Sequence, residues 1–426
     1  MDCGPPAARD RRDHDAVADA GGGLKILATG DLHLGAGADL GREPGDRLRD
    51  QAAVLDQIAH LARTEEVAAV LVAGDVFDRP RPLPEELAVA ADFVDLLDDV
   101  LIITGNAGHD IRNAEAYAAV QLFDYRNWVD VHRQPGVWRR SRFAVATLPS
   151  VPVSRLVASR NGGPREAIYA DAADYLLEVA RGLRAEIPAD TPAVLLAHWS
   201  VSGASLPNGL PTDALNETVL PLPDLEALGF DAIVLGHIHK AQLLNEPTMD
   251  ELRPMLYVGS PMPLNFGEAE TAHGVFILEW DAVGFFRERF FPIESRRFVT
   301  VDADLTSRVF PSDHAHDETD EIAAAIAEQF PLEGAIVRIR YKASAEQHRR
   351  VDQAALRRLI LDAGAAKVHG ILPDVVREDR ARVAGLDEQV DGEQALDAWL
   401  AAQDVDRALA SRMRVRHARY LEEARA

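Results

Sequence analysis

Five short polar strings, each placed where an apolar run ends, constrain the fold of this chain more than any other feature. In chain order they are 31–33 (DLH), 74–78 (GDVFD), 105–110 (GNAGHD), His198 within AHW, and 236–239 (GHIH). Asp, Asn and His side chains bind metals, and sites in open α/β sheets form beyond the carboxyl ends of the strands. The strings therefore predict a dinuclear metal site assembled at strand ends.

Apolar runs alternate with amphipathic helical patterns from residue 24 onward. The run 24–30 precedes a helical pattern with Leu48, Leu55, Ile58 and Leu61 on one face, and the run 68–74 then completes a β-α-β unit. Pro84 suits the first turn of a second helix. Further strands are expected at 100–105, 143–149, 193–199, 231–239, 255–260 and 274–280. A layered α/β sandwich is the economical architecture for this order of elements.

Three further segments flank this predicted core, 24–295. Residues 1–23 are polar and rich in Gly and Pro, so we expect disorder there. Residues 296–380 alternate strand and helix patterns and predict a small α+β domain, and 381–426 end in helices with apolar stripes. Such a stripe docks either on its own chain or on a partner.

Composition limits the ligands and the partners. The chain has one cysteine, Cys3, which excludes a thiolate metal cage and leaves His, Asp and Asn as ligands. No apolar run is long enough to span a bilayer and no signal core is present, so we expect a cytoplasmic protein without a membrane partner. The net charge of -24 is awkward for binding nucleic acid, so a polyanion must meet a local basic patch, the metals or a basic partner.

The residue types predict how two divalent cations are held. We assign Asp31, His33, Asp75 and His239 to one metal, and Asp75, Asn106, His198 and His237 to the other. Asp75 bridges both because a carboxylate has two oxygens. Two cations with two aspartates leave a charge near +2, which lowers the pKa of a shared water and attracts phosphate. The predicted reaction is phosphoester hydrolysis by a metal-bridging hydroxide.

The leaving oxygen needs a proton, and His109 is the predicted donor. Asp78 from the GDVFD string is expected to orient the His109 ring without binding metal, and Asp110 is an alternative.

These five strings resemble those of the calcineurin-like metallophosphoesterase superfamily over residues 24–295. The segment 257–268 (YVGSPMPLNFGE) and the C-terminal region also resemble the nuclease subunits of SbcCD-type DNA-repair complexes. The resemblance implies a four-layer α/β/β/α sandwich with a capping domain at 296–380. It also implies a manganese-dependent exonuclease or endonuclease that processes DNA ends, a homodimer, and a coiled-coil SMC-like ATPase of SbcC type bound through the C-terminal helices.

The third string departs from the family pattern GNHD. Ala107 and Gly108 separate Asn106 from His109, so either the loop bulges at Gly108, which we expect, or the proton donor is displaced and activity is weakened.

Other interpretations stay open. A small-molecule or cyclic-nucleotide phosphodiesterase would need the same metal site, and a catalytically weak scaffold for the ATPase would fit the altered third string. Two basic clusters, 139–142 and 338–342, are candidates for DNA contacts, although such clusters more often form a solvated surface.

Overall fold

The computed structural model describes residues 23–41, 43, 45–106, 108–109, 117, 128–153, 164–245, 253–281, 286–306, 319, 323, 326, 331–376, 391–403 and 405–425. The chain divides into two compact units. One comprises Met1–Val301, Ala323–Ile339 and Arg357–Gly370, and the other comprises Asp302–Ile322, Arg340–Leu356 and Ile371–Ala426. The segment expected to be disordered, 1–23, lies outside the described residues except for Gly23. The predicted domain boundaries at residues 296 and 380 stay predictions.

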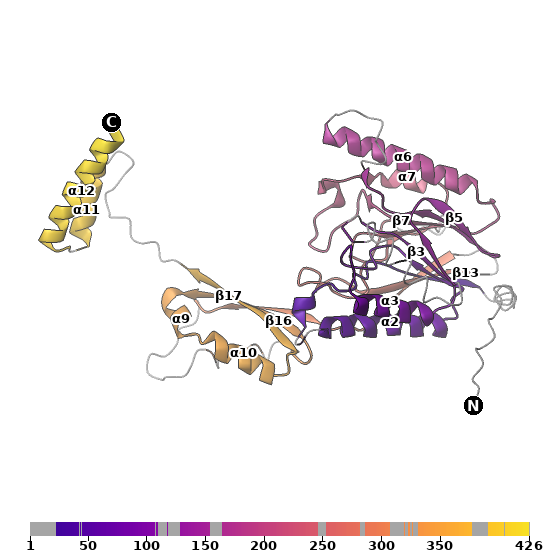
Figure 1. Cartoon of the computed structure of the whole chain (residues 1–426), viewed down its shortest axis with the longest axis horizontal. Coiled ribbons are helices and arrows are strands. Elements are labelled where there is room, and N and C mark those ends of the chain that lie inside the picture. Colours follow the sequence, from indigo (N-terminus) through magenta and orange to yellow (C-terminus); the bar gives the residue numbers. More distant parts are fainter. Residues whose placement is uncertain are drawn as a thin grey trace. The chain divides into compact units, whose positions relative to one another are not determined.

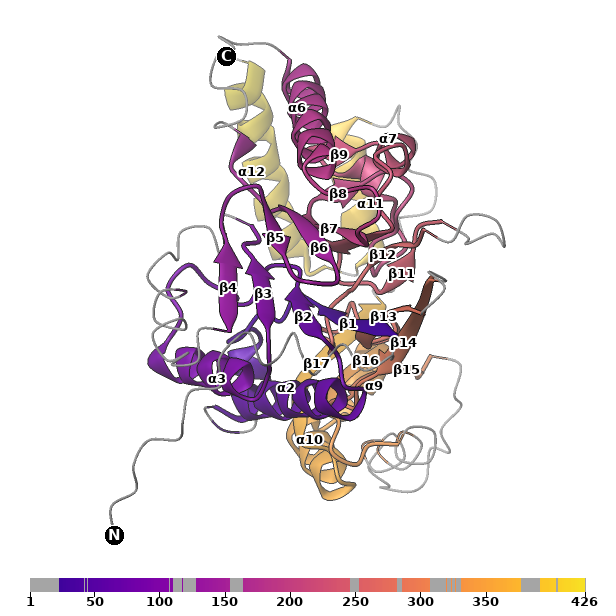
Figure 2. The same ribbon diagram turned by 90° about the vertical axis from the view of Figure 1, so that its right-hand side faces the viewer.

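Two six-stranded mixed sheets form the larger part of the first unit. The first has the order β14-β13-β1-β2-β3-β4 and the second the order β11-β12-β10-β7-β6-β5. The first sheet consists of β1 (Leu24–Thr29), β2 (Ala69–Val72), β3 (Val100–Ile103), β4 (Val129–His132), β13 (Gly274–Trp280) and β14 (Phe286–Pro292). The second consists of β5 (Gly136–Arg139), β6 (Ala144–Leu148), β7 (Ala193–His198), β10 (Ala232–Gly236), β11 (Gln242–Leu243) and β12 (Met255–Tyr257). Figure 2 shows β4, β3, β2 and β1 side by side in this order.

Helices cover the outer face of each sheet. The helices α2 (Asp46–Thr64) and α3 (Pro84–Asp95) lie on one side of the strands, and α6 (Arg165–Ala185) and α7 (Leu222–Glu226) lie on the other (Figure 1). Alternate residues of β1 divide between two cores: Leu27 packs in the core beneath α2 and α3, whereas Ile26 and Ala28 pack between the sheets. The central strands of both sheets are buried on both faces, which explains why they read as continuous apolar runs. The predicted α/β fold is confirmed.

The remaining elements form two further sheets and several helices. A third sheet has the order β15-β16-β17, and a two-stranded sheet joins β8 to β9. The bounds are η1 (Ala38–Leu40), β8 (Ser200–Val201), η2 (Thr212–Ala214), β9 (Val219–Leu220), β15 (Phe298–Asp304), β16 (Ile336–Ser344), α9 (Ala345–Arg350), α10 (Gln353–Asp362), β17 (Lys367–Val376), α11 (Gly392–Ala402) and α12 (Arg407–Arg425). Within the described ranges, no helix combines the length and the apolar character needed to cross a bilayer.

Candidate metal centre

The polar strings lie together where parallel strands of both sheets reach their carboxyl ends. From the first sheet come Asp31 and His33 after β1, Asp75 and Asp78 after β2, and Asn106 and His109 after β3. From the second sheet come His198, the last residue of β7, and His237 and His239 after β10. The structure thus brings all nine predicted residues to one place. Seven of them line one cavity, while Asp31 and His198 are buried beside it.

The backbone at the site adopts conformations that non-glycine residues rarely take. Asp31, His33, Asp75 and His237 have φ angles of 48°, 44°, 49° and 91°, and they are four of the six non-glycine residues with positive φ in the described chain. A positive φ angle at such residues costs folding free energy, and it persists only where surrounding contacts fix the backbone. Two backbone hydrogen bonds do so here: Asp31 N–H donates to the Gly74 carbonyl and His33 N–H to the Asp75 carbonyl, both at 3.0 Å.

Three histidine rings are each oriented by an oxygen acceptor that binds one of the two ring nitrogens. His198 Nδ1–H donates to the Ala73 carbonyl oxygen at 2.6 Å. Glu217 accepts from His237 Nε2 at 2.8 Å, and Glu268 accepts from His239 Nδ1 at 3.0 Å. Because a neutral imidazole protonated at one nitrogen carries a lone pair on the other, each ring presents an acceptor nitrogen on its opposite side. This is how histidine ligands of metals are held in proteins.

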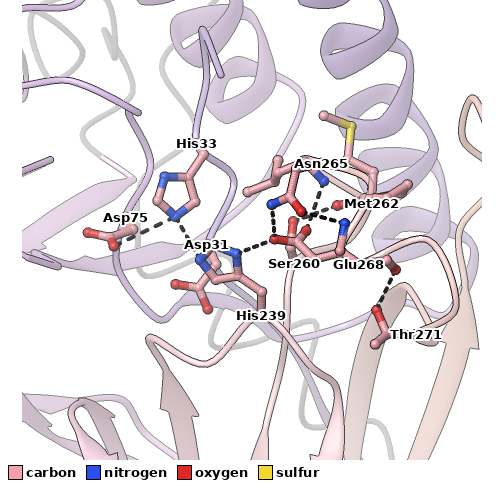
Figure 3. A network of polar contacts seen from close by, with 12 residues as sticks. Asp31, His33, Asp75, His239, Ser260, Met262, Asn265, Glu268 and Thr271 are labelled. Atoms are coloured by element: carbon pink, nitrogen blue, oxygen red, sulfur yellow. Dashed lines mark hydrogen bonds and ion pairs between the residues drawn. The ribbon is translucent and has the colours of Figure 1, made fainter. Parts of the chain in front are cut away.

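The Nε2 atoms of His33, His239 and His198 lie close to one another or to the Asp75 carboxylate. The Nε2 atoms of His33 and His239 are 3.1 Å apart, and Figure 3 shows both rings beside Asp31 and Asp75. His198 Nε2 is buried without a hydrogen-bond partner, and it lies 3.4 Å from Asp75 Oδ2. Two ligand atoms bound about 2.1 Å from one cation lie roughly 3 Å apart. The orphaned nitrogen and the facing donor pair therefore fit a bound divalent metal.

Backbone N–H groups from neighbouring loops hold the two aspartates. Asp75 Oδ1 accepts from Asn106 N–H at 2.7 Å, while Asp75 Oδ2 lies between His198 and His33, 3.7 Å from His33 Nε2. Both oxygens of Asp31 lie 3.0 Å from the backbone nitrogen of His237. Asp75 Oδ2 is consequently placed between the two predicted half-sites.

Asp75 and His198 form a buried ion pair that shifts the pKa values of both groups. Burial opposes ionisation of Asp75, but His198 and His33 outweigh it and hold the pKa of Asp75 well below its ordinary value. For His198, burial would lower the pKa, yet Asp75 raises it to about 9. Glu268 similarly raises the pKa of His239 against the effect of burial. The neighbouring carboxylates thus stabilise positive charge on both rings.

Asp78 contacts His109 in a different way from the one we expected. His109 Nδ1–H donates to the backbone carbonyl oxygen of Asp78 at 2.7 Å, and the Asp78 carboxylate instead lies 3.5 Å from His33 Nδ1. The carboxylate is therefore turned to His33, and the main chain orients His109. Despite the two additional residues in the third string, His109 lines the same cavity as His33, with ring centroids 4.6 Å apart. Ala107 and Asp110 lie outside the described residues.

Sequence reasoning missed the residues that support the ligands. Glu217 lies in a loop without any motif, 20 residues before His237. Glu268 ends the quoted segment 257–268, but its pairing with His239 was not foreseen. Gln51 on α2 donates to the His33 carbonyl at 2.9 Å and accepts from Gly35 N–H at 3.0 Å. All three contacts join residues far apart in the chain, so no local pattern indicates them.

The basic clusters are largely compensated by acidic residues. Arg140 binds Asp99 with two hydrogen bonds of 2.5 Å and also contacts Asp130 at 3.2 Å. Arg340 pairs with Asp302 at 2.7 Å. These guanidinium groups therefore offer little free charge to a phosphate backbone.

Replacing Glu268 with Gln is expected to weaken Mn²⁺ binding about 10- to 100-fold, because the carboxylate that orients His239 and increases its basicity is lost. Glu217→Gln should act in the same way through His237. Calorimetric titration of the metal-free protein with Mn²⁺ measures both effects. Glu270→Gln, an exposed neighbour of Glu268, is the matched control and should bind Mn²⁺ like the unmodified chain. Unchanged affinity in both test variants would mean that neither carboxylate supports a ligand.

Comparisons with known proteins identify a family and similar relatives. The profile of a family described as Calcineurin-like phosphoesterase matches residues 24–241, half of the 426-residue chain. The D subunit of nuclease SbcCD from Escherichia coli (strain K12) is 28% identical over 273 residues, covering 60% of this chain and 64% of that protein. The protein of the same name from Bacillus subtilis (strain 168) is 27% identical over 274 residues, covering 60% and 66%. The chain thus spans just under two thirds of the length of these relatives.

Proposed function

The chain belongs to the calcineurin-like phosphoesterase family, and from this premise we propose that it hydrolyses phosphodiester bonds of DNA as the nuclease subunit of an SbcCD-like complex. The convergence of four imidazoles and two aspartates at the ends of two sheets carries the proposal. The similarity to the two SbcCD nuclease chains supports the choice of DNA. In this proposal, residues 24–295 form the catalytic domain and 296–380 a capping domain.

The proposed cofactor is a pair of divalent cations, with manganese as the family resemblance implies. One cation would be held by Asp31, His33, Asp75 and His239, and the other by Asp75, Asn106, His198 and His237. When bound, such cations supply positive charge for the phosphate and lower the pKa of water in the site. Proximity supports this assignment, since Asn106 Nδ2 and His237 Nδ1 lie 2.9 Å apart. An amide turned to present its oxygen would let both side chains reach one cation.

His109 is the proposed proton donor to the leaving oxygen. Its Nδ1–H is bound to the Asp78 carbonyl, so Nε2 is the nitrogen that remains for the substrate. As the P–O ester bond breaks, the imidazolium donates its Nε2 proton to the leaving oxygen and remains protonated at Nδ1. The anchored ring thereby delivers the proton from a fixed position.

His109→Ala is expected to lower the turnover number about 10²- to 10⁴-fold, because the leaving oxygen loses its proton donor. Mn²⁺ binding should stay unchanged, since no proposed ligand is altered. Steady-state cleavage and Mn²⁺ titration measure the two properties. His60→Ala, an exposed histidine on α2, is the control. Full turnover in His109→Ala would assign the proton donor to another group.

Incubation of the purified chain and Mn²⁺ with three substrates tests the proposed function. The substrates are end-labelled duplex DNA, the single strand and a cyclic nucleotide. Cleavage of DNA is the expected result. Turnover of the cyclic nucleotide alone would overturn the nuclease assignment, and no turnover, even with a coiled-coil ATPase added, would favour the scaffold.

The proposed partner is an SbcC-type ATPase bound through α11 and α12, and we propose that the nuclease chain forms a homodimer. Large apolar side chains on these helices are exposed, including Trp399, Leu409, Val415 at 70% and Tyr420. Exposed apolar groups of this size favour a partner surface. An ATPase that supplies duplex affinity would also account for the net charge of -24 and the compensated arginines.

A further inference from the structure

The cavity at the metal centre has a second wall of different chemistry. It encloses 530 Å³, enough for a nucleotide-sized ligand. Besides the predicted site residues, it is lined by Ala36, Gly37, Asp39, Leu40, Leu264, Asn265, Phe266 and His369. None of the described lining residues is a lysine or an arginine. This wall therefore offers apolar and aromatic surface where a chain of phosphates would require cations.

Phe266 is the fixed centre of this wall. The Phe298 ring packs edge-to-face against it at 4.9 Å, and Arg338 Cζ lies 4.4 Å from its centroid. The His369 ring lies 5.4 Å from Phe266, tilted by 36°, and His369 is exposed. The packed phenylalanine thus supports a second planar ring that faces the cavity.

The backbone of β17 sets the orientation of His369. Val368 is buried, so its neighbours Lys367 and His369 lie on the opposite face of the strand. Lys367 Nζ donates to the carbonyl oxygens of Asp39 and Gly41, the latter at 2.7 Å. Because Asp39 also lines the cavity, this ammonium group ties the η1 loop to the strand that carries His369. The wall is therefore braced on two sides.

We propose that His369, supported by Phe266, is a stacking platform for the nucleobase attached to the phosphate at the metal centre. The inference rests on the proposed function, and it specifies nucleotidyl phosphodiesters as the substrate class. Aromatic rings stack on any base, so the platform selects for the presence of a base and is tolerant of its identity. Stacking is also an interaction that a wall without lysine or arginine can provide.

Equilibrium binding of two product-like ligands tests the platform independently of turnover. Deoxyadenosine monophosphate and deoxyribose 5-phosphate share the phosphate and sugar and differ in the base. The Mn²⁺-loaded chain should bind the nucleotide about 5- to 100-fold more tightly, measured by titration calorimetry. His369→Ala should remove this difference without changing Mn²⁺ affinity, and His369→Phe should preserve it.

Cleavage assays separate this proposal from the proposed function. An oligonucleotide with a normal nucleotide beside the scissile bond should be cleaved more slowly by His369→Ala, whereas one with an abasic sugar there should be unaffected. Absence of DNA cleavage by the unmodified chain would contradict the nuclease assignment. The binding test does not depend on turnover and would then decide whether His369 stacks on a base. Equal affinities for the two ligands in the unmodified chain, or an undiminished difference in His369→Ala, would overturn the platform.

Discussion

Asp75→Asn is expected to abolish the binding of both cations and to lower phosphodiesterase activity by more than about 100-fold. Loss of a group that only orients a metal ligand costs about 10- to 100-fold, and loss of a ligand itself should cost more. The reason is the position of this side chain. Asp75 Oδ1 is occupied by the N–H of Asn106, and Asp75 Oδ2 lies within 3.7 Å of both His33 Nε2 and His198 Nε2. If the amide NH₂ group faces the Asn106 N–H, two donors meet, and if it faces the metals, a donor replaces the ligand oxygen. The negative charge is lost in both orientations.

Metal content measured after dialysis into Mn²⁺ gives the clearest result for Asp75→Asn. The unmodified chain should hold two ions per molecule and the variant substantially fewer than one. Asp92→Asn, on the surface of α3, removes the same charge at a remote position and should retain both ions. Circular dichroism verifies that the variant is folded, because the change leaves buried His198 without its counter-ion. Two ions bound by folded Asp75→Asn would contradict the role of a bridging carboxylate.

The sequence predicted the strand ends because the information there is local. Each apolar run and the string that follows it lie within about ten residues of one another, as in 24–33 and 68–78. Parallel pairing of β1 with β2 and of β7 with β10 then brings the strings together without further assumptions. Side-chain burial on α2 was less predictable: Arg47 is buried, whereas Leu48 is partly exposed. Arg47 donates to the Pro263 carbonyl, a contact that helical periodicity alone does not reveal.

Orientation within the site was beyond local reasoning. Asp78 offers both a carboxylate and a main-chain carbonyl, and only the three-dimensional arrangement assigns the carbonyl to His109 and the carboxylate to His33. The left-handed backbone of Asp31, His33 and Asp75 could not be predicted either, because residues other than glycine rarely adopt a positive φ angle. Hydrogen bonds between loops compensate for this cost. Local sequence preferences therefore disagree with the backbone conformation at the site.

Gly105→Ala is expected to remove metal binding through a steric effect on Asp75. A Cβ atom on Gly105 would lie 2.0 Å from Asp75 Oδ1 and 2.4 Å from Asp75 N. The backbone nitrogen cannot yield easily, since neighbouring Gly74 accepts the N–H of Asp31 at 3.0 Å. Either the Asp75 carboxylate or the loop that carries Asn106 must therefore shift, and both residues are proposed ligands. Overpacking of this kind also costs about 1–3 kcal/mol of folding stability.

Gly108→Ala provides the matched control three residues along the same loop. A Cβ atom there meets nothing within 4 Å, and neither glycine has the left-handed φ that would itself oppose alanine. Calorimetric titration with Mn²⁺ and thermal unfolding should thus show lost binding and a lowered melting temperature for Gly105→Ala, and neither change for Gly108→Ala. If Gly105→Ala bound two Mn²⁺ ions with unchanged affinity, the Asp75 carboxylate could not be a ligand in its present position. Because the variant alters no donor atom, loss of metal would show that the placement of Asp75 and Asn106, beyond their presence, determines binding.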